Sequence, residues 1–503
     1  MSARAQLELR ILAAAVVLGV LADALLRTFP WGLNLCLWMA TLATIVALHT
    51  GSRKEALSGA SRWLPLLVSL FALVFAWRDS VALKTLSFLA SLTALSLIML
   101  RAQGGRIRFA GLAEYAAGAT VAGLNAGFGL FLLLFGDAEW SKALNGRSSR
   151  PAMAAIRGTL FALPCLLVFG GLFMGADAVF NHIVRNTLRV NWPQLFSHLL
   201  VLGFFAWCSG GYLRGMLWGQ EMAAIKGKRR PSLSLGAIEG GVMLGILDVL
   251  FLAFVAVQIR YFFGGSALVQ ATTGLTYAEY ARRGFFSLFG VTVLVLPLLL
   301  IVHWLMAQRG PEGERVFRLL GAVQILLLFV VMASAARRMQ LYQAEYGLTE
   351  ERLYATAFMG WLAAVFLWFT MTVLAGRRDR FAFGALVTGF GLVIVLQALN
   401  PDALIAYTNL ERAKAGRRLD VRYATLLSAD AVPAVVAGLQ DLTPPQRCAV
   451  ASEVLKRWPP WQSSDWRTWN WSQMRAIEVV RANARELTAM QAAKCPPQEE
   501  VIH

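Results

Sequence analysis

The chain has 503 residues, of which 57% are apolar and only 15% are charged, and its mean hydropathy is +0.58. Soluble domains carry about a quarter charged residues, so this composition excludes an ordinary soluble protein and indicates a membrane protein. The net charge of +18 does not indicate a nucleic-acid partner: residues 400–503 contribute 13 basic and 11 acidic side chains, and the remaining excess lies in loops between apolar runs.

Eleven apolar runs have roughly the 20-residue length that a membrane-crossing helix needs, although the shortest, 63–77, crosses only if neighbouring residues extend it. We therefore predict an all-α fold, in which a polytopic helical membrane domain over 1–399 precedes a small extracytoplasmic helical domain over 400–503. The predicted spans are 10–28, 31–49, 63–77, 81–100, 156–180, 195–219, 240–263, 284–306, 315–335, 352–375 and 381–399.

The segment 111–136 is apolar enough to cross the membrane, but five glycines, Glu114 and Asn125 interrupt it. Lys and Arg concentrate in cytoplasmic loops. With a cytoplasmic N-terminus and a non-crossing 111–136, 22 of the Lys and Arg residues in 1–399 lie inside and 11 outside; if the segment crosses, the counts become 16 and 17. We therefore predict a re-entrant or interfacial segment, an uncleaved first span and an outside C-terminus.

The polar tail reads as helices over 402–414 and 421–440, with an interruption near Pro433, then a helix to about Arg457 and a last one capped by Ser472. Five tryptophans lie within fourteen residues of this tail, and they form either the core of a small domain, the interpretation we prefer, or a ligand or membrane-interface surface. They are Trp458, Trp461, Trp466, Trp469 and Trp471.

Cys448 and Cys495 are the only two cysteines of the tail, and an extracytoplasmic compartment permits a disulfide between them. Two free thiols are the alternative interpretation.

The usual catalytic signatures are absent from the sequence: it has no HExxH, P-loop, GxSxG or paired CxxC motif. Its five histidines are too dispersed for a zinc site, which needs three or four protein ligands. We expect no metal and no cofactor, and the sequence does not favour an enzyme.

Two acidic residues lie within predicted spans, where charges are costly and often functional. Asp177, near the outer end of its span, is either exposed to headgroups or buried and paired. Asp248 lies about two turns from the inner end of the 240–263 span. It forms either part of a proton or cation path with Glu239 or, as we prefer, an ion pair with Arg214.

The connection between the spans 240–263 and 284–306 is unusually polar. On a helix, Glu279 faces both Arg282 (i+3) and Arg283 (i+4), so one guanidinium stays available. The connection is either an interfacial elbow that turns into the bilayer at Gly284 or a patch that binds an anion or a partner. The candidate residues here are Gln258, Arg260, Tyr277, Glu279, Tyr280, Arg282 and Arg283.

At these residues the chain resembles a family of bacterial polytopic membrane proteins known as a domain of unknown function. The resemblance extends from about 150 to 475 and implies a multi-pass protein of the bacterial inner membrane, but no reaction. The matching segments are ADAVF (176–180), VQIRY (257–261), FGG (263–265), TYAEYARRGFF (276–286), LNPD (399–402) with Asn409, LSADAVP (427–433) and DWRTWN (465–470).

In the predicted topology all of these segments reach the outer face, so we expect a composite surface where the 264–284 connection meets the tail. Asp402, Asn409 and Asp430 belong to this candidate patch, and Asp402 and Asp430, with Glu411 and Asp420, would supply acidic partners for four arginines. Those arginines are Arg282, Arg283, Arg417 and Arg418.

Three functions are compatible with this sequence. The first is an envelope sensing or assembly scaffold that binds a protein partner or a lipid headgroup at its outer face. The second is a secondary transporter of a small solute, which a polar path past Asp248 and Gln324 would favour. The third is an enzyme acting on a lipid-linked substrate.

Overall fold

The structure is a computed structural model, and it describes residues 3–51, 63–134, 169–180, 191–218, 235–273, 277–306, 311–461 and 465–492, with isolated positions between 158 and 166. For 259–273 and 277–283 it describes the backbone alone. The regular structure of all these described residues is helical, which confirms the predicted all-α fold.

Nine helices of the described residues are long and apolar enough to cross a membrane, and two shorter apolar helices accompany them. The prediction of a polytopic membrane protein is therefore confirmed. The principal helices are α1 (Ala3–Leu26), α2 (Leu33–Gly51), α3 (Leu64–Trp77), α4 (Val81–Ala102), α5 (Leu112–Leu124), α10 (Trp192–Trp218), α12 (Ala237–Thr273), α13 (Tyr277–Met306), α14 (Pro311–Tyr346), α15 (Glu350–Phe369) and α16 (Phe381–Leu399).

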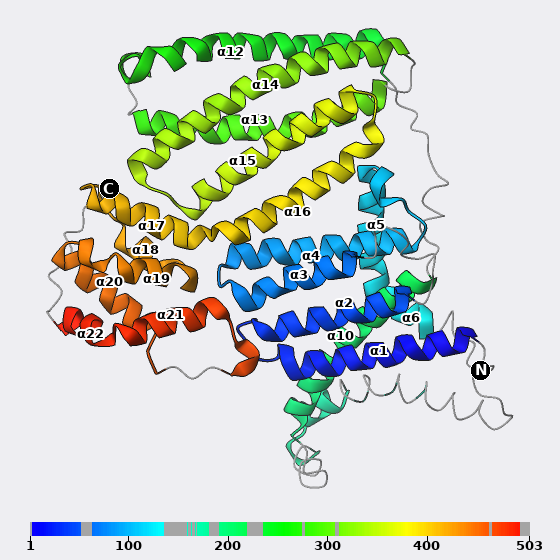
Figure 1. The fold of residues 1–503 in the computed structure, drawn as a ribbon. Helices are drawn as coiled ribbons and strands as arrows, with labels where there is room; N and C mark the ends of the chain where they lie inside the picture. Colours follow the sequence, from blue (N-terminus) through cyan, green and yellow to red (C-terminus); the bar gives the residue numbers. More distant parts are fainter. Residues whose placement is uncertain are drawn as a thin grey trace.

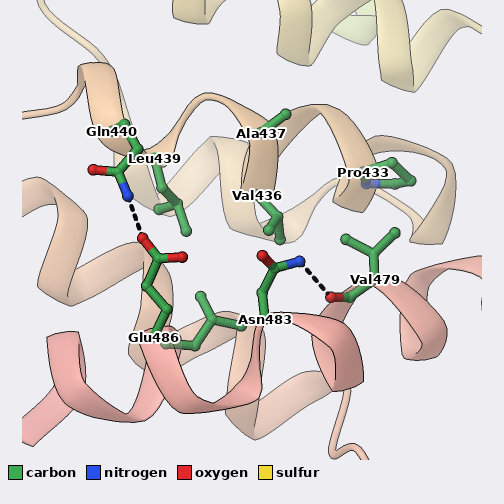
Figure 2. A pocket seen from close by; sticks show the side chains of 9 residues that line it. Pro433, Val436, Ala437, Leu439, Gln440, Val479, Asn483 and Glu486 are labelled. Carbon is green, nitrogen blue, oxygen red and sulfur yellow. Dashed lines mark hydrogen bonds between the residues drawn. The ribbon is translucent and has the colours of Figure 1, made fainter.

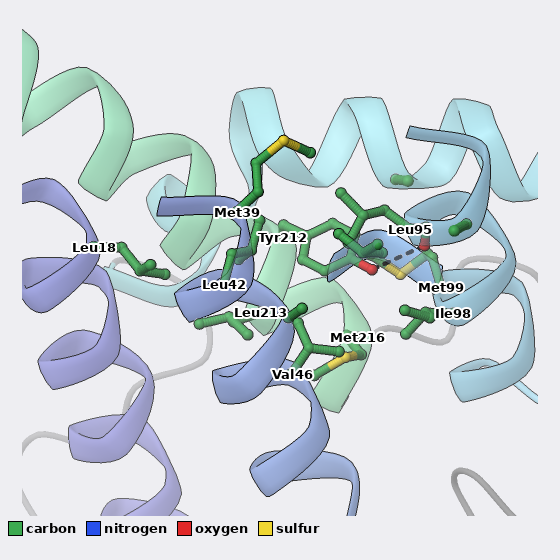
Figure 3. Packing of buried hydrophobic residues seen from close by; sticks show 14 of the residues in the cluster. Leu18, Met39, Leu42, Val46, Leu95, Ile98, Met99, Tyr212, Leu213 and Met216 are labelled. Carbon is green, nitrogen blue, oxygen red and sulfur yellow. Dashed lines mark hydrogen bonds between the residues drawn. The ribbon is translucent and has the colours of Figure 1, made fainter. Parts of the chain in front are cut away.

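The membrane helices form two packed groups (Figure 1). One apolar core joins α1–α5 with α10, and its Met39, Leu42, Leu95 and Tyr212 side chains converge in Figure 3. A second core joins α12–α16. Helix α16 also contacts α4, so it connects the two groups.

The glycine-rich segment is one continuous apolar helix, because α5 passes through a π-helical stretch, η3 (Asn125–Gly129), into α6 (Leu130–Leu132). By length and composition it could cross a membrane. Figure 1 shows α5 running crosswise to α1–α4. A Cβ on Gly211 of α10 would lie 2.1 Å from the Asn125 carbonyl oxygen, so glycine allows α10 to approach this stretch backbone to backbone.

The tail folds into a helical body with its own apolar core, to which Leu348 and Leu353 also contribute. In Figure 1 it lies at the opposite end of the membrane helices from the N-terminus. Its elements are α17 (Pro401–Lys414), α18 (Val421–Leu426), η7 (Ala429–Ala431), α19 (Val432–Ala437), η8 (Leu439–Asp441), α20 (Pro444–Arg457), η9 (Trp466–Thr468), α21 (Trp471–Ala482) and α22 (Ala484–Ala492).

The predicted cap of the last helix was wrong. Asn470, not Ser472, is the N-cap of α21, and its side-chain oxygen accepts a hydrogen bond from the Gln473 amide at 3.1 Å. Ser472 lies within the first turn instead, and its hydroxyl is available for the junction described next.

Candidate functional site

A buried ion pair joins the membrane helices to the C-terminal body. Arg78 directly follows α3, and its NH1 lies 3.1 Å from Oδ1 of Asp430 in η7. The two residues are 9% and 6% exposed. A buried charge needs a partner and further hydrogen bonds to offset its desolvation, so this pair restrains both segments.

The Asp430 carboxylate is fully engaged. Its Oδ2 accepts from the backbone amide of Asp79 at 2.7 Å, and its Oδ1 accepts from the Ser472 hydroxyl at 2.7 Å. Arg78 uses its remaining donors on α16, because both Nε and NH2 donate to the Gln397 carbonyl, at 3.2 and 2.7 Å. Four segments, the ends of α3 and α16 with η7 and α21, therefore meet at one pair of charges.

The neighbouring residues of the tail reinforce this junction. The Asn470 side-chain amide donates to the carbonyls of Phe75 and Arg78, at 2.8 Å each. NH1 of Arg467, which is held by Asp465, donates to the Ala24 carbonyl of α1 at 2.9 Å. The DWRTWN segment thus ties the body to α1 and α3.

A second acidic residue of the junction lacks a cation. Asp402 is 1% exposed, its Oδ2 accepts from the Ser428 amide at 3.2 Å, and its Oδ1 has no hydrogen-bond donor. Burial raises the pKa of Asp402, and the neighbouring Asp430 charge raises it further. The Glu350 carboxyl lies within hydrogen-bonding reach, so the two carboxyls are best satisfied when they share one proton.

Other buried polar atoms around this carboxyl pair also lack hydrogen-bond partners. They belong to residues at the end of α16, namely Gln397 and Asn400, while the Tyr354 hydroxyl lies within hydrogen-bonding reach of Ser80. Buried polar groups are normally satisfied, so such a concentration is typical of a functional site that holds water or a ligand.

A pocket of about 340 Å³ opens beside the ion pair, between the end of α16 and the helices η7, α19 and α21. Its lining includes Arg78, Asp430, Asn400, Trp471 and Arg475. Arg475 is exposed and has no ion-pair partner among the described residues. The pocket therefore combines one available guanidinium and one aromatic face.

A second pocket of the body, about 330 Å³, lies between α19 and α21–α22 (Figure 2). Its polar groups are already paired, since Gln440 donates to Glu486 and Asn483 donates to the Val479 carbonyl. It offers less to a ligand than the junction pocket.

The structure describes four side chains of the predicted patch, and Asp402 and Asp430 are the two that it brings together at the junction. Asn409 binds the turn between α14 and α15, accepting from the Leu348 amide and donating to its carbonyl, at 2.8 Å each. Gln258 lies elsewhere, on α12, where its Oε1 accepts from Ser334 and Arg338 of α14. The other patch side chains, Arg260, Tyr277, Glu279, Tyr280, Arg282 and Arg283, lie outside the described residues.

The described acidic residues have partners other than the predicted ones, while pairing with Arg282 or Arg283 lies outside the described side chains. Asp430 binds Arg78, and Asp420 caps α18 through the Tyr423 amide. Glu411 binds Lys414, and Arg417 lies 3.6 Å from Glu345. The predicted elbow was also wrong, because α13 runs from Tyr277 through Gly284 without a break and α12 extends to Thr273.

The preferred ion pair between Asp248 and Arg214 was wrong as well. Arg214 donates to the Asn125 side chain at 3.0 Å, in the first core, whereas Asp248 lies on α12 beside the second. Both Asp248 oxygens are buried without a hydrogen-bond partner. Asp177 is exposed and binds the Val179 amide at 2.7 Å, so its buried alternative was wrong too.

The interpretation of the tryptophans as a core also fails for most of them. Trp458 is buried, but Trp461, Trp466 and Trp471 are 82%, 62% and 50% exposed. The alternative, an aromatic surface, describes these three better.

Cys448 is buried in α20 and is disulfide-bonded. Cys495, the partner that the sequence predicted, lies outside the described residues. Cys36 and Cys208 are free.

A family model described as "Domain of unknown function (DUF4153)" matches residues 65–438, more than half of the chain. The chain belongs to this family. The matched range starts well before position 150, where the sequence resemblance began, and so includes Arg78 together with Asp402 and Asp430. The DWRTWN segment falls beyond it. A search of curated proteins and a search of solved structures found no match.

Sequence reasoning missed Arg78, Asp79 and Arg475. The signal for the first two was the WRDS connection, which is only a few residues long and lies between two apolar runs. A charge that is buried in such a place needs a partner of opposite charge.

The raised pKa of Asp402 predicts that the stability of the folded protein depends on pH. The folded pKa of Asp402 lies above the unfolded value near 4, so the folded state binds more protons in that window, and stability falls as pH rises through it. Asp402→Asn keeps an acceptor for Ser428 and adds a donor toward Glu350. We expect it to be at least as stable as the wild type at pH 8 and to show a flatter melting temperature between pH 4.5 and 8.

Asp420→Asn is the control, because it also removes one carboxylate but asparagine still caps a helix. Thermal unfolding in detergent across this pH range measures the difference. A D402N protein that melts several degrees below both the wild type and the control at pH 8 would contradict the shared proton.

Proposed function

We propose that this protein is a binding scaffold of the bacterial inner membrane, with a cytoplasmic N-terminus and an extracytoplasmic C-terminal body. Its junction pocket binds the anionic headgroup of a membrane lipid. The observation that carries this proposal is the combination, in one pocket beside a rigid ion pair, of the available Arg475 guanidinium with the exposed Trp471 ring.

The position of the pocket supports a lipid ligand. Its Arg78 follows α3, and its Asn400 follows α16, so it lies where membrane-length helices end. Exposed aromatic rings cluster at the same ends: Phe29 and Trp31 between α1 and α2, Trp77 at the end of α3, and Trp466 in η9. Exposed tryptophans are typical of the headgroup level of a bilayer.

The charge of the lining supports an anion. Arg78 is neutralised by Asp430, which leaves Arg475 to face a phosphate. A glycerophosphate headgroup offers such a phosphate.

The topology supports the proposed orientation, with a cytoplasmic N-terminus and an extracytoplasmic C-terminal body. The N-terminus and the C-terminal body lie at opposite ends of the helices in Figure 1. The positive-inside rule then assigns the body to the outer side, because the basic loops concentrate on the N-terminal side.

We expect Arg475→Ala to weaken binding of short-chain phosphatidylglycerol by about tenfold, the value of one charge-assisted hydrogen bond. Titration of the detergent-solubilised protein, followed by native mass spectrometry, measures this affinity against phosphatidylcholine of the same chain length. Arg485→Ala, which removes an exposed charge from α22, is the matched control. Equal affinity of the wild type for the two lipids would sink the proposal, as would equal losses in the two variants.

Transport is a second candidate function, favoured by one observation in the α12–α14 pair. These two helices run in the same direction on either side of α13 in the chain (Figure 1), and Gln258 contacts Ser334. Asp248 lies ten residues before Gln258 on α12, and Gln324 lies ten residues before Ser334 on α14, so the two residues are at the same level. Gln324 is fully buried and, like Asp248, has no hydrogen-bond partner. A carboxyl without a counterion at membrane depth is neutral when protonated, as in proton-coupled carriers.

Dicyclohexylcarbodiimide tests this candidate, since it modifies protonated carboxyls in apolar surroundings. We expect peptide mapping of membrane vesicles to find the adduct on Asp248, less of it at higher pH, and none in Asp248→Asn. Asp430, which is paired with Arg78, serves as the internal control and should stay unmodified. Absence of the adduct from Asp248 at pH 6 contradicts a proton-carrying role.

A further inference from the structure

We propose that a phospholipid binds at the end of the membrane helices away from the C-terminal body. One acyl chain occupies a groove bounded by α2, α4, α5 and α10, and the phosphate lies beside the arginines of η2 (Ile107–Phe109) and η6 (Arg378–Arg380). This site shares no residue with the junction pocket and does not rest on the proposed function.

The groove has a volume of about 540 Å³, within the range of ligand pockets. Figure 3 shows part of its surroundings, where Tyr212 of α10 lies close to Leu95 of α4 and Leu42 of α2. Most of its lining is aliphatic, and α5 contributes small residues, Ala119, Ala122 and Gly123. A long, thin apolar ligand fits such a space better than a bulky one.

Four of the five hydroxyl groups that line the groove are already occupied, and Ser209 carries the fifth. Tyr212 donates to the Leu95 carbonyl at 2.8 Å, and Tyr115 donates to the Ile107 carbonyl at 2.7 Å. Thr93 and Ser96 each donate to the carbonyl four residues earlier, at 2.8 Å. These four groups have no proton left for a polar ligand, and most of the remaining lining is aliphatic, so hydrocarbon is the occupant that this lining favours.

The groove opens toward the bilayer. Leu89 and Leu92, on the spanning helix α4, line it and are 53% and 43% exposed. Ala119 and Gly123 of α5 are exposed as well. A ligand that enters here comes from the hydrocarbon region, where acyl chains are the abundant occupant.

A phosphate group has a cationic partner at one end of the groove. The Tyr115 hydrogen bond connects the groove to η2, where Arg106 and Arg108 flank Ile107 and are exposed. Helix η2 contacts η6, whose Arg378 and Arg380 are also exposed. Four arginines with one intervening carboxylate, Asp379, give this end a net positive charge, which attracts anionic headgroups.

Photo-crosslinking tests the acyl-chain site. The probe is phosphatidylglycerol with a diazirine in one acyl chain, mixed into phosphatidylethanolamine vesicles that contain the full-length protein. We expect peptides from 89–97 and 115–126 to carry several times more label than the exposed face of α15.

Gly123→Phe fills the groove: a Cβ at Gly123 meets nothing within 4 Å, so the ring enters open space. Gly127→Phe is the matched control, because its Cβ also meets open space but Gly127 does not line the groove. With melting temperatures equal, we expect labelling of 115–126 to fall about fivefold in the first variant and to be unchanged in the second. Equal labelling of the two variants overturns the groove as the acyl site.

A second arm tests the phosphate. Diacylglycerol with the same diazirine chain lacks the phosphate, and we expect it to label the wild type about fivefold less. The double variant Arg106→Gln and Arg108→Gln should reduce labelling by the phosphatidylglycerol probe to the level of diacylglycerol. Equal labelling of the wild type by the two probes overturns the headgroup part of the proposal.

Discussion

The ion pair between Arg78 and Asp430 is the constraint on which the relation of the membrane helices to the C-terminal body depends. Neither charge can remain buried alone, because an uncompensated charge in the interior costs several kcal/mol or more. The pair joins positions 352 apart in the chain, and almost every donor and acceptor of its two side chains is used. Such a pair contributes more to a unique arrangement than to raw stability.

Other features of the junction follow from this pair. Arg78 donates to the Gln397 carbonyl, and the Gln397 side chain in turn donates to Ser87 of α4 at 3.0 Å, so the two membrane groups are held together at the same level. Asp79 accepts from the Ala429 amide at 3.2 Å and lies 3.0 Å from Lys84. The Asp402–Glu350 carboxyl pair and the junction pocket lie beside this ion pair. Some buried polar atoms in this region have no hydrogen-bond partner in the protein.

Local patterns in the sequence predicted the fold well, because the cost of burying backbone polar groups in lipid makes every long apolar run a helix. The family resemblance singled out LNPD, Asn409, LSADAVP and DWRTWN; the side chains of Asp402, Asp430 and Asn470 are buried at the junction, whereas Asn409 binds the turn between α14 and α15. The partners of these residues were missed. Sequence spacing carries no information on contacts between positions 78 and 430, so acidic residues were assigned to the nearest conspicuous arginines instead.

The errors share a physical cause. The start of the last helix depends on a tertiary contact, because Ser472 is engaged by Asp430 and Asn470 is the cap. The preferred interpretation of the tryptophans assumed that a small domain must bury them. Its core is built mainly from Val, Leu and Ala, with Trp458 as its one fully described buried tryptophan, and three other rings are exposed. The role of the tyrosine and arginine side chains over 277–283 in an outer-face patch remains a prediction from sequence.

A double-mutant cycle on Arg78→Met and Asp430→Leu, measured by denaturant unfolding in detergent, tests the central claim most directly. Each single variant leaves one buried charge unpaired, and we expect it to lose about 3–5 kcal/mol of unfolding free energy. The double variant should lose at least about 2 kcal/mol less than the sum, because it leaves no buried charge of the pair. Additive losses would contradict the account, since they would mean that the two charges do not act as a pair.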